Sequence, residues 1–117
     1  MTFYYLATPY SKYPWGLEEA YRFACRQAAM LAQANVPVFS PIAFTHGIAI
    51  HGGISPMNHE FWMKFDEPFM AMAHSLIVVK APTWEASRGI AVEVATFVES
   101  GKPVIYMEPD RMPAELL

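Results

Sequence analysis

Hydrophobic residues along the chain alternate between short runs rich in strand formers and longer stretches with helical spacing. Four short runs predict strands, at residues 2–7, 36–40, 75–80 and 104–107. The run at 75–80 is almost continuously apolar, which is typical of a strand buried on both faces of a parallel sheet. Pro37 lies near the start of its run, where a missing N–H is tolerated, or on a sheet edge.

Two of the longer stretches predict helices with identifiable ends. Residues 17–34 have apolar side chains at helical spacing and acidic residues in the first turn, and Asn35 supplies a stop. Residues 86–100 form the second, with Ser87 as candidate N-cap and Gly101 as the residue after the end.

The middle of the chain is harder to assign. Residues 41–57 contain three glycines and two prolines without a clean period, so we expect a long loop with at most a helical turn. Asn58 can cap a helix from 59 towards 73, in which Pro68 predicts a kink or a restart near Asp66. Residues 108–117 are expected to form a loop or a short turn.

The resulting order, strand and helix in alternation, predicts a single α/β domain over residues 1–117. Its architecture is expected to be a Rossmannoid three-layer α/β/α sandwich with a parallel sheet of about four strands. In such sheets the ligand site lies outside the carboxyl ends of the strands. Here those ends are residues 7–11, 40–46, 80–89 and 107–110.

The composition of the chain argues against several classes of protein. With 54% hydrophobic and 16% charged residues in 117, a disordered chain is excluded. The net charge of −3 argues against nucleic acid as a partner. One cysteine, Cys25, permits no internal disulfide, and we expect it to be a buried, inert thiol. No apolar run approaches the roughly 18 residues of a membrane span, and no signal peptide is evident, so we expect a cytoplasmic protein with no membrane partner.

Aromatic residues at 15% and eight methionines are many for so small a chain. They indicate either a dense core or apolar side chains that line a ligand cleft or a subunit interface.

Phosphate-binding glycine motifs are absent: there is neither G-x-G-x-x-G nor G-x-x-x-x-G-K-[ST]. Glu93 is more informative, because it is a lone charge in the apolar stretch 89–95. Gly89, one turn earlier, leaves space beside this carboxylate for a ligand. The alternative is a solvent-facing Glu on an amphipathic helix.

Other candidates have an ordinary structural reading as well. Ser87 and Arg88 open a helix, where free N–H groups favour an anion; equally, they are an N-cap and a surface arginine. Asp66 is either a second carboxylate near Glu93 or the N-cap of a helix restarting at Pro68. His46 is expected to form hydrogen bonds from a loop near the cleft.

Metal ligation is not favoured by the four histidines, because no H-E-x-x-H pattern or cysteine pair accompanies them. Tyr4, Tyr5, Phe61 and Trp62 are expected in the core. The loop aromatics could stack on a base; these are Tyr10, Trp15 and Trp84.

Three segments resemble known proteins. Tyr5-Leu6-Ala7-Thr8-Pro9-Tyr10-Ser11 looks like the Y-L-A-x-P-Y-S opening of nucleoside 2-deoxyribosyltransferase-like proteins. Ser87-Arg88-Gly89-Ile90-Ala91-Val92-Glu93, followed by Gly101-Lys102-Pro103-Val104, resembles their S-x-G-[IV]-x-x-E and G-K-P-V block. More closely, nearly the whole chain resembles the domain of unknown function 1937 family. The residues concerned are Phe39-Ser40-Pro41-Ile42, His46-Gly47-Ile48-Ala49, Trp62, Asp66 and Trp84-Glu85-Ala86-Ser87-Arg88-Gly89.

The resemblance implies a flavodoxin-like sheet in the order 2-1-3-4. It implies that Glu93 is the nucleophile that attacks C1′ of a nucleoside or nucleotide, and that Asp66 protonates the departing base or orients Glu93. Ser87 and Arg88 match the position that binds a 5′-phosphate, and Tyr5 or Tyr10 would line the cleft beside the sugar. The full set of binding residues expected is Tyr5, Pro9, Tyr10, His46, Trp84, Ser87, Arg88 and Gly89.

Two functions therefore stay open. The first is an N-glycosidase or deoxyribosyltransferase without metal or cofactor, assembled as a homo-oligomer (dimer or tetramer). The second is a nucleotide- or nucleoside-binding module of the same fold that performs no chemistry. A histidine-dependent metal hydrolase is a third and weaker alternative.

Overall fold

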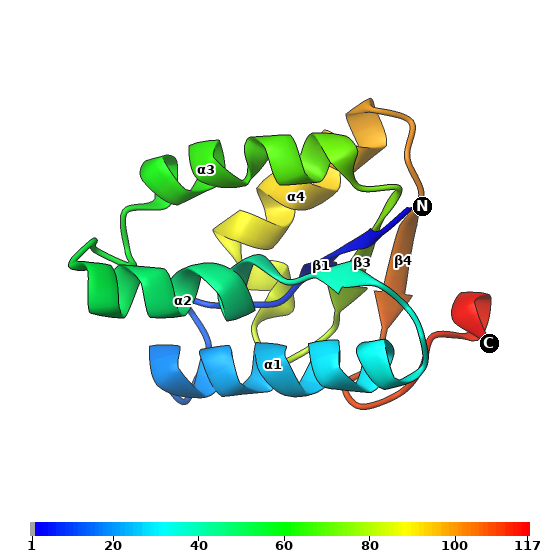
Figure 1. Cartoon of the computed structure of the whole chain (residues 1–117), viewed down its shortest axis with the longest axis horizontal. Helices are drawn as coiled ribbons and strands as arrows, with labels where there is room; N and C mark the ends of the chain where they lie inside the picture. Colours follow the sequence, from blue (N-terminus) through cyan, green and yellow to red (C-terminus); the bar gives the residue numbers. More distant parts are fainter. Residues whose placement is uncertain (1) are drawn as a thin grey trace.

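A parallel sheet of four strands lies at the centre of the molecule, in the order β2-β1-β3-β4 (Figure 1). The computed structural model describes residues 2–117. The strands are β1 (Tyr4–Ala7), β2 (Val38–Phe39), β3 (Ser75–Val79) and β4 (Val104–Met107). In register, Tyr4 lies opposite Ser75, and Leu76 lies opposite Val104. The expected α/β fold and strand order are confirmed.

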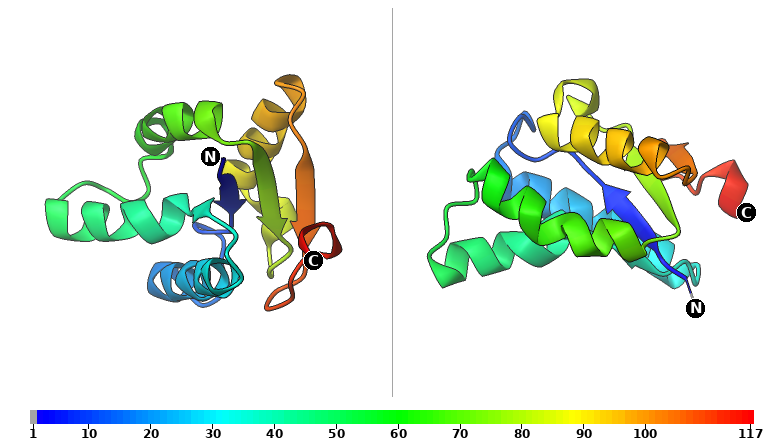
Figure 2. Two further views of the ribbon diagram at one scale, coloured as in Figure 1. Left: turned by 45° about the vertical axis from the view of Figure 1, so that its right-hand side comes forward. Right: turned by 90° about the horizontal axis from the view of Figure 1, so that it is seen from above.

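Helices cover both faces of this sheet, as the two views of Figure 2 show. They are α1 (Leu17–Gln33), α2 (Pro41–Gly52), α3 (His59–Met72) and α4 (Arg88–Glu99), with single 3₁₀ turns at Trp84–Ala86 and Ala114–Leu116. α3 and α4 lie side by side on one face, and α1 covers the other. α2 packs along α1 and extends away from the sheet.

Alternate residues of the central strands supply the two halves of the core. Leu6, Ile77 and Val79 point to the α1 side, where they pack with Phe23 and Leu31. The intervening positions point to α3 and α4; these are Tyr5, Ala7, Leu76 and Val78. All five residues of β3 are buried, as its apolar run predicts.

The expected loop at 41–57 is wrong, because its first two thirds form the helix α2. Ser40 caps this helix by accepting a hydrogen bond from the Ala43 N–H at 3.2 Å, and Pro41 occupies its first turn. Gly53 ends it with φ of 72°. No helical period was visible because α2 carries apolar side chains on its exposed side as well, including Phe44 and Ile50.

A kink or a restart was expected near Asp66, and the restart is wrong, since α3 continues through Pro68. Proline removes the bond to the carbonyl of Lys64, and both residues are exposed, so water can satisfy that carbonyl. Asp66 is therefore not an N-cap. It is a buried residue in the third turn of the helix.

The expected helix ends are confirmed, whereas the expected burial of individual side chains is only partly correct. Asn35 and Gly101 follow the ends of α1 and α4 with φ of 62° and 70°, as expected for helix stops. Trp62 and Tyr5 are buried, but Phe61 is 44% exposed and Cys25 is only half-buried. Within residues 2–117, no helix has the length and hydropathy needed to cross a membrane.

Candidate functional site

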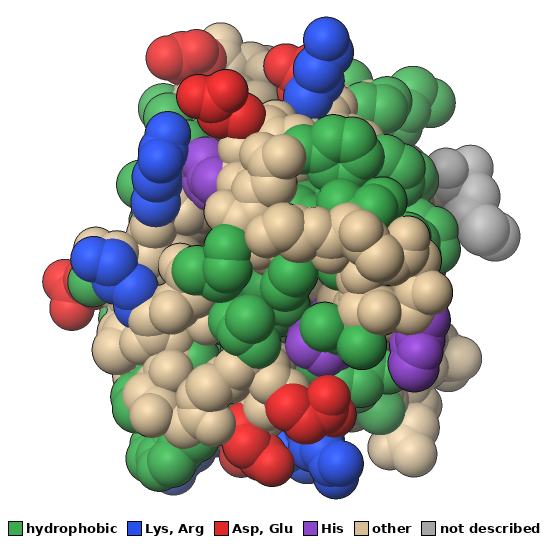
Figure 3. Space-filling view, turned by 90° about the vertical axis from the view of Figure 1, so that its left-hand side faces the viewer, with side chains coloured by type: hydrophobic (Ala, Val, Ile, Leu, Met, Phe, Trp, Pro, Cys, Tyr) green, Lys and Arg blue, Asp and Glu red, His purple; other side chains and the backbone are tan. Residues whose placement is uncertain are grey.

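A cavity of about 290 Å³ opens where β1 ends, between α2, α3 and the first turn of α4. This is the carboxyl end of the sheet, where ligand sites occur in parallel α/β folds. Its volume is near the lower end of the roughly 300–1,000 Å³ typical of small-molecule sites. The face that carries the α2–α3 connection has hydrophobic side chains at its centre, with acidic and basic side chains around them (Figure 3).

Two carboxyl groups line this cavity. Asp66 comes from α3 and Glu93 from α4, and each is only 5% exposed. Glu93 is thus not on a solvent-facing helix surface. Ionised carboxylates are rarely buried in this way unless they are paired or needed for function.

The Tyr5 side chain lies near both carboxyls. Its side chain is fully buried, and its ring packs between Phe39 and Phe97 at centroid distances of 5.6 and 5.8 Å. Burial and the nearby Glu93 and Asp66 raise the pKa of its hydroxyl, which therefore keeps its proton. The hydroxyl is then a permanent donor facing two acidic groups.

Burial also raises the pKa of both acids. Desolvation raises the pKa of Asp66 to about 7, against a smaller lowering effect of the Tyr5 hydroxyl. Desolvation raises the pKa of Glu93 to about 8, and the charge of Asp66 adds to this rise while Tyr5 opposes it. Between these values the two carboxyls together hold a single proton.

Several buried polar atoms around the carboxyls have no hydrogen-bond partner among residues 2–117. They are the Tyr5 hydroxyl, Thr8 Oγ1 and Asp66 Oδ1. Thr8 and Asp66 line the cavity. Unpaired buried polar atoms cost about 1–3 kcal/mol each, and atoms gathered at one cavity are suited to a ligand that completes their bonds.

The first turn of α4 forms another wall. Ser87 is buried and caps the helix, since its Oγ accepts a hydrogen bond from the Ile90 N–H at 3.2 Å. Gly89 lines the cavity, and a Cβ there would meet only Ser87 Oγ, at 3.9 Å. Arg88 is exposed at the rim. This combination of helix N-terminus, hydroxyl and guanidinium is suited to an anionic group.

Tyr10 and His46 form the wall on the α2 side. The Tyr10 hydroxyl lies 2.6 Å from His46 Nδ1, and His46 Nε2 lies 3.3 Å from Glu18 Oε1 on α1. His46 makes hydrogen bonds near the cleft as expected, but from a helix rather than a loop. Burial raises the pKa of Tyr10 to about 12, with a contribution from the charge of Glu18.

Not every residue selected from the sequence lies at the cavity. Trp84 packs on Tyr106 with a centroid distance of 5.7 Å, away from the lining residues. Tyr5 and Pro9 are fully buried, and neither lines the cavity. Those that do are Tyr10, His46, Asp66, Ser87, Arg88, Gly89 and Glu93.

Other lining residues were missed by the sequence analysis. Thr8 lies within the β1-end segment already identified, so its position was a usable signal. Thr45 and Ala49 lie on α2, whose helical form was not expected. Trp62 was assigned to the core; it lines the cavity while its Nε1–H donates to the Ser55 carbonyl at 3.0 Å.

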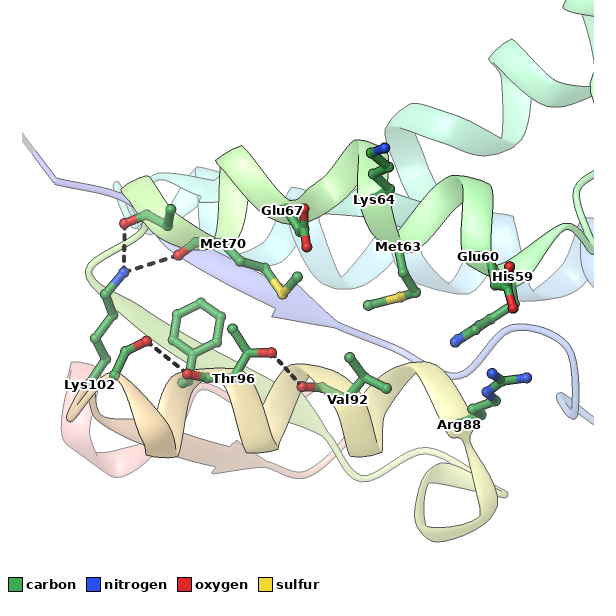
Figure 4. A pocket seen from close by; sticks show the side chains of 13 residues that line it. His59, Glu60, Met63, Lys64, Glu67, Met70, Arg88, Val92, Thr96 and Lys102 are labelled. Atoms are coloured by element: carbon green, nitrogen blue, oxygen red, sulfur yellow. Dashed lines mark hydrogen bonds between the residues drawn. The ribbon is translucent and has the colours of Figure 1, made fainter.

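A groove of about 530 Å³ continues from the cavity between α3 and α4 (Figure 4). The two spaces share His59, Met63 and Arg88. The ring of His59 points towards the Arg88 guanidinium, and burial and this positive charge lower the pKa of His59. At the far end, Lys102 Nζ donates to the carbonyls of Met70 and Ala71, at 3.0 and 2.7 Å.

Within the described part of the chain, no three His, Cys, Asp or Glu side chains come together as a metal site would require. The four histidines do not form such a cluster either. The site is therefore described by its carboxyls, hydroxyls and cationic rim.

Comparison with known proteins gives one result for the family. A family model described as "Domain of unknown function (DUF1937)" matches residues 2–109. No curated protein matches the chain.

Proposed function

The chain belongs to the DUF1937 family, and we propose that it is an enzyme acting on the N-glycosidic bond of a nucleoside or nucleotide. The observation that carries the proposal is the pairing of two buried carboxyls, Asp66 and Glu93, in one cavity. The buried Tyr5 hydroxyl is near enough to both that their charges raise its pKa. We also propose, from the resemblance of its β1 and α4 motifs, that the family belongs to the nucleoside 2-deoxyribosyltransferase-like superfamily.

The chemistry requires two acidic groups in different protonation states. An ionised Glu93 attacks C1′, so that a C–O bond forms while the C–N bond breaks and its electron pair passes to the base. Asp66 supplies the proton that the departing base takes up. Water, or a second base in a transferase, then attacks C1′ from the opposite side, the ester bond breaks, and the incoming group's proton returns to Asp66.

The electrostatics provide one charged and one neutral acid, but Glu93 has the higher pKa, so in the free protein the shared proton lies on Glu93. The proposed roles therefore require this proton to pass to Asp66 when the substrate binds. Because the pair holds a single proton between about pH 7 and 8, one acid is charged while the other is neutral near physiological pH. The Tyr5 hydroxyl keeps its proton and faces the pair. None of these steps requires a metal or an organic cofactor.

The substrate's other groups have complementary surroundings. Ser87, Arg88 and the α4 N-terminus are suited to a 5′-phosphate. Tyr10 and the apolar wall provided by Trp62 and Met63 are suited to the sugar and base.

A binding module without turnover is the second candidate. It is favoured by the raised pKa of Glu93, because a carboxyl that stays protonated at neutral pH is a hydrogen-bonding group and a poor nucleophile. In that case Glu93→Gln would keep ligand affinity, and no base would be released by either protein.

We further propose a homo-oligomer. Phe44, Phe61 and Phe65 on α2 and α3 are between 37% and 47% exposed, in a patch that a second copy could cover. Light scattering on the purified protein would give the mass of the species in solution.

Base release tests the main proposal. Nucleosides and their 5′-monophosphates are incubated with the protein, with and without a second base as acceptor, and products are separated by chromatography. Wild type should release base, while Glu93→Gln and Asp66→Asn should not. Glu99→Gln, an exposed position of the same helix, is the matched control. Equal turnover by wild type and Glu93→Gln would refute the proposal.

A further inference from the structure

A chain of hydrogen bonds runs from the cavity wall to the surface through a buried histidine. Tyr10 lines the cavity and lies 2.6 Å from His46 Nδ1. His46 Nε2 lies 3.3 Å from Glu18 Oε1 on the neighbouring helix. The other oxygen of Glu18 accepts a hydrogen bond from Arg22 Nε at 3.2 Å.

Glu18 determines which ring nitrogen of His46 carries the hydrogen. An ionised carboxylate only accepts hydrogen bonds, so His46 Nε2 must bear the hydrogen that points to Glu18. Glu18 is ionised at neutral pH, because the hydrogen bonds from His46 and Arg22 lower its pKa. In a neutral imidazole the other nitrogen, Nδ1, then has a lone pair and no hydrogen.

This tautomer of His46 also determines the direction of the Tyr10 hydroxyl hydrogen. Since His46 Nδ1 is an acceptor, the hydrogen of the Tyr10 hydroxyl must point at it. The Tyr10 oxygen then offers only its lone pairs to the cavity. Tyr10 keeps its proton under these conditions, since burial raises its pKa to about 12.

The histidine ring has little freedom to turn away. His46 is 5% exposed, and its ring stacks on Tyr21 with centroids 4.6 Å apart and planes 20° apart. Tyr10 packs edge-on against the same ring at 5.7 Å. Both hydrogen-bonding edges of the imidazole are therefore held between α1 and the loop after β1.

We infer that Tyr10 is a specificity-determining residue that selects a hydrogen-bond donor on the ligand, with His46 and Glu18 as positioning residues. The donor is a hydroxyl or an amino group, and a ligand that presents an acceptor at this point is rejected. The identity of the ligand as a nucleoside or nucleotide rests on the proposed function. The orientation of Tyr10 does not.

The orientation is tested without any ligand. Long-range ¹H–¹⁵N spectra of labelled protein distinguish protonated from unprotonated imidazole nitrogens. We expect His46 at neutral pH to show a protonated Nε2 and an unprotonated Nδ1. Tyr10→Phe should move the Nδ1 signal, and Glu18→Ala should reduce the preference for this tautomer. Glu19→Ala, the adjacent exposed residue of α1, should do neither. A protonated Nδ1 in the wild type would overturn the inference.

The selectivity is tested by calorimetric binding of defined probes. These are adenosine, guanosine, cytidine and uridine 5′-monophosphates, their 2′-deoxy and 3′-deoxy forms, and the 6-deamino form of the adenosine nucleotide. The nucleotide that binds most tightly is compared with the probes that each lack one of its donor groups. Removal of the donor that faces Tyr10 should weaken binding to wild type about tenfold, because the Tyr10 oxygen is then an acceptor without a partner. Tyr10→Phe should bind the parent more weakly and no longer distinguish the pair.

The NMR and calorimetric experiments distinguish a failure of this inference from a failure of the proposed function. If no probe binds while His46 has the expected tautomer, the proposed function fails and the orientation of Tyr10 stands. If probes bind but Tyr10→Phe discriminates between them as wild type does, the selectivity inference fails and the proposed function is untouched.

Discussion

The carboxyl groups of Asp66 on α3 and Glu93 on α4 lie close enough that a charge on Asp66 raises the pKa of Glu93. Neither acid can ionise without affecting the other, so they titrate as a pair. The pair lies in a cavity whose remaining walls provide hydroxyl groups and a cationic rim. Several measurable properties depend on this coupling.

Activity should depend on pH as a bell-shaped curve. One acid must be charged and the other protonated, and the pair holds a single proton between the pKa values of about 7 and 8. We expect kcat/KM for base release to be highest in that interval and to fall on both sides. A profile that rises steadily from acid to alkaline pH would contradict a protonated acid in the reaction.

Stability should also depend on pH, in a defined direction. Glu93 has a folded-state pKa of about 8 against an ordinary value of 4.5, so the folded protein binds more protons than the unfolded chain between them. The free energy of unfolding must fall as pH rises through this interval and level off above it.

Glu93→Gln should therefore be more stable than wild type in alkaline solution and should show a weaker pH dependence. We expect a gain of about 1 kcal/mol or more at alkaline pH, which is roughly 4 °C in Tm for a domain of this size. Melting curves recorded at several pH values across this interval measure the difference in Tm. Glu99→Gln, which is exposed, should follow the wild-type curve.

Gly89→Ala should separate stability from binding. Alanine is favoured over glycine in a helix by up to about 1 kcal/mol, and the new Cβ has free space around it apart from Ser87 Oγ at 3.9 Å. We expect a higher Tm together with weaker nucleotide binding, because the methyl group enters the cavity beside Ser87. Unchanged affinity would show that the ligand does not approach the first turn of α4.

Arg88→Gln should reduce the preference for a phosphorylated ligand. A guanidinium at the rim and the N-terminus of α4 both favour an anion. We expect the ratio of affinities for a nucleoside 5′-monophosphate and its nucleoside to fall about tenfold, since a hydrogen bond to a charged group contributes ~1.5–3 kcal/mol. Lys64→Gln on the α3–α4 groove serves as the control, and an equal effect there would indicate general charge attraction.

Lys102→Met should weaken the fold without affecting turnover. The Lys102 ammonium donates to two carbonyls at the C-terminus of α3, an end that carries partial negative charge. We expect a loss of about 1 kcal/mol in the free energy of unfolding, measured by urea denaturation. Base release should stay at the wild-type rate, because Lys102 lies at the end of the groove opposite to His59 and Arg88, where the groove meets the cavity.

The sheet could be predicted from the sequence because its signals are local. The apolar run at Ser75–Val79 and the caps at Ser87 and Gly101 each act within a few residues, and all appear in the structure as expected. The helix α2 was missed for a physical reason. Its exposed side is apolar, so the contrast that normally identifies a helix is absent, although Ser40, Pro41 and Gly53 mark its ends.

Individual residues of the candidate site could be predicted from the sequence, but the contacts between them could not. Glu93 was recognisable as a charge among apolar residues, but the depth at which Asp66 lies depends on α3 continuing through Pro68. The link between Tyr10, His46 and Glu18 joins positions that are 36 and 28 residues apart in the sequence. No local pattern encodes such a link; it follows from how α1 and α2 pack.

The order of strands in the sheet also has a consequence for synthesis. β1 pairs with β3 in a register that joins Tyr4 to Ser75, positions separated by more than half of the chain. At roughly 5–20 residues per second, a ribosome needs several seconds to make the intervening segment. During that time one edge of β1 has no partner, and the apolar residues Tyr5 and Leu6 have only part of their final surroundings. Chaperones that shield extended apolar segments should therefore engage the nascent chain before β3 emerges.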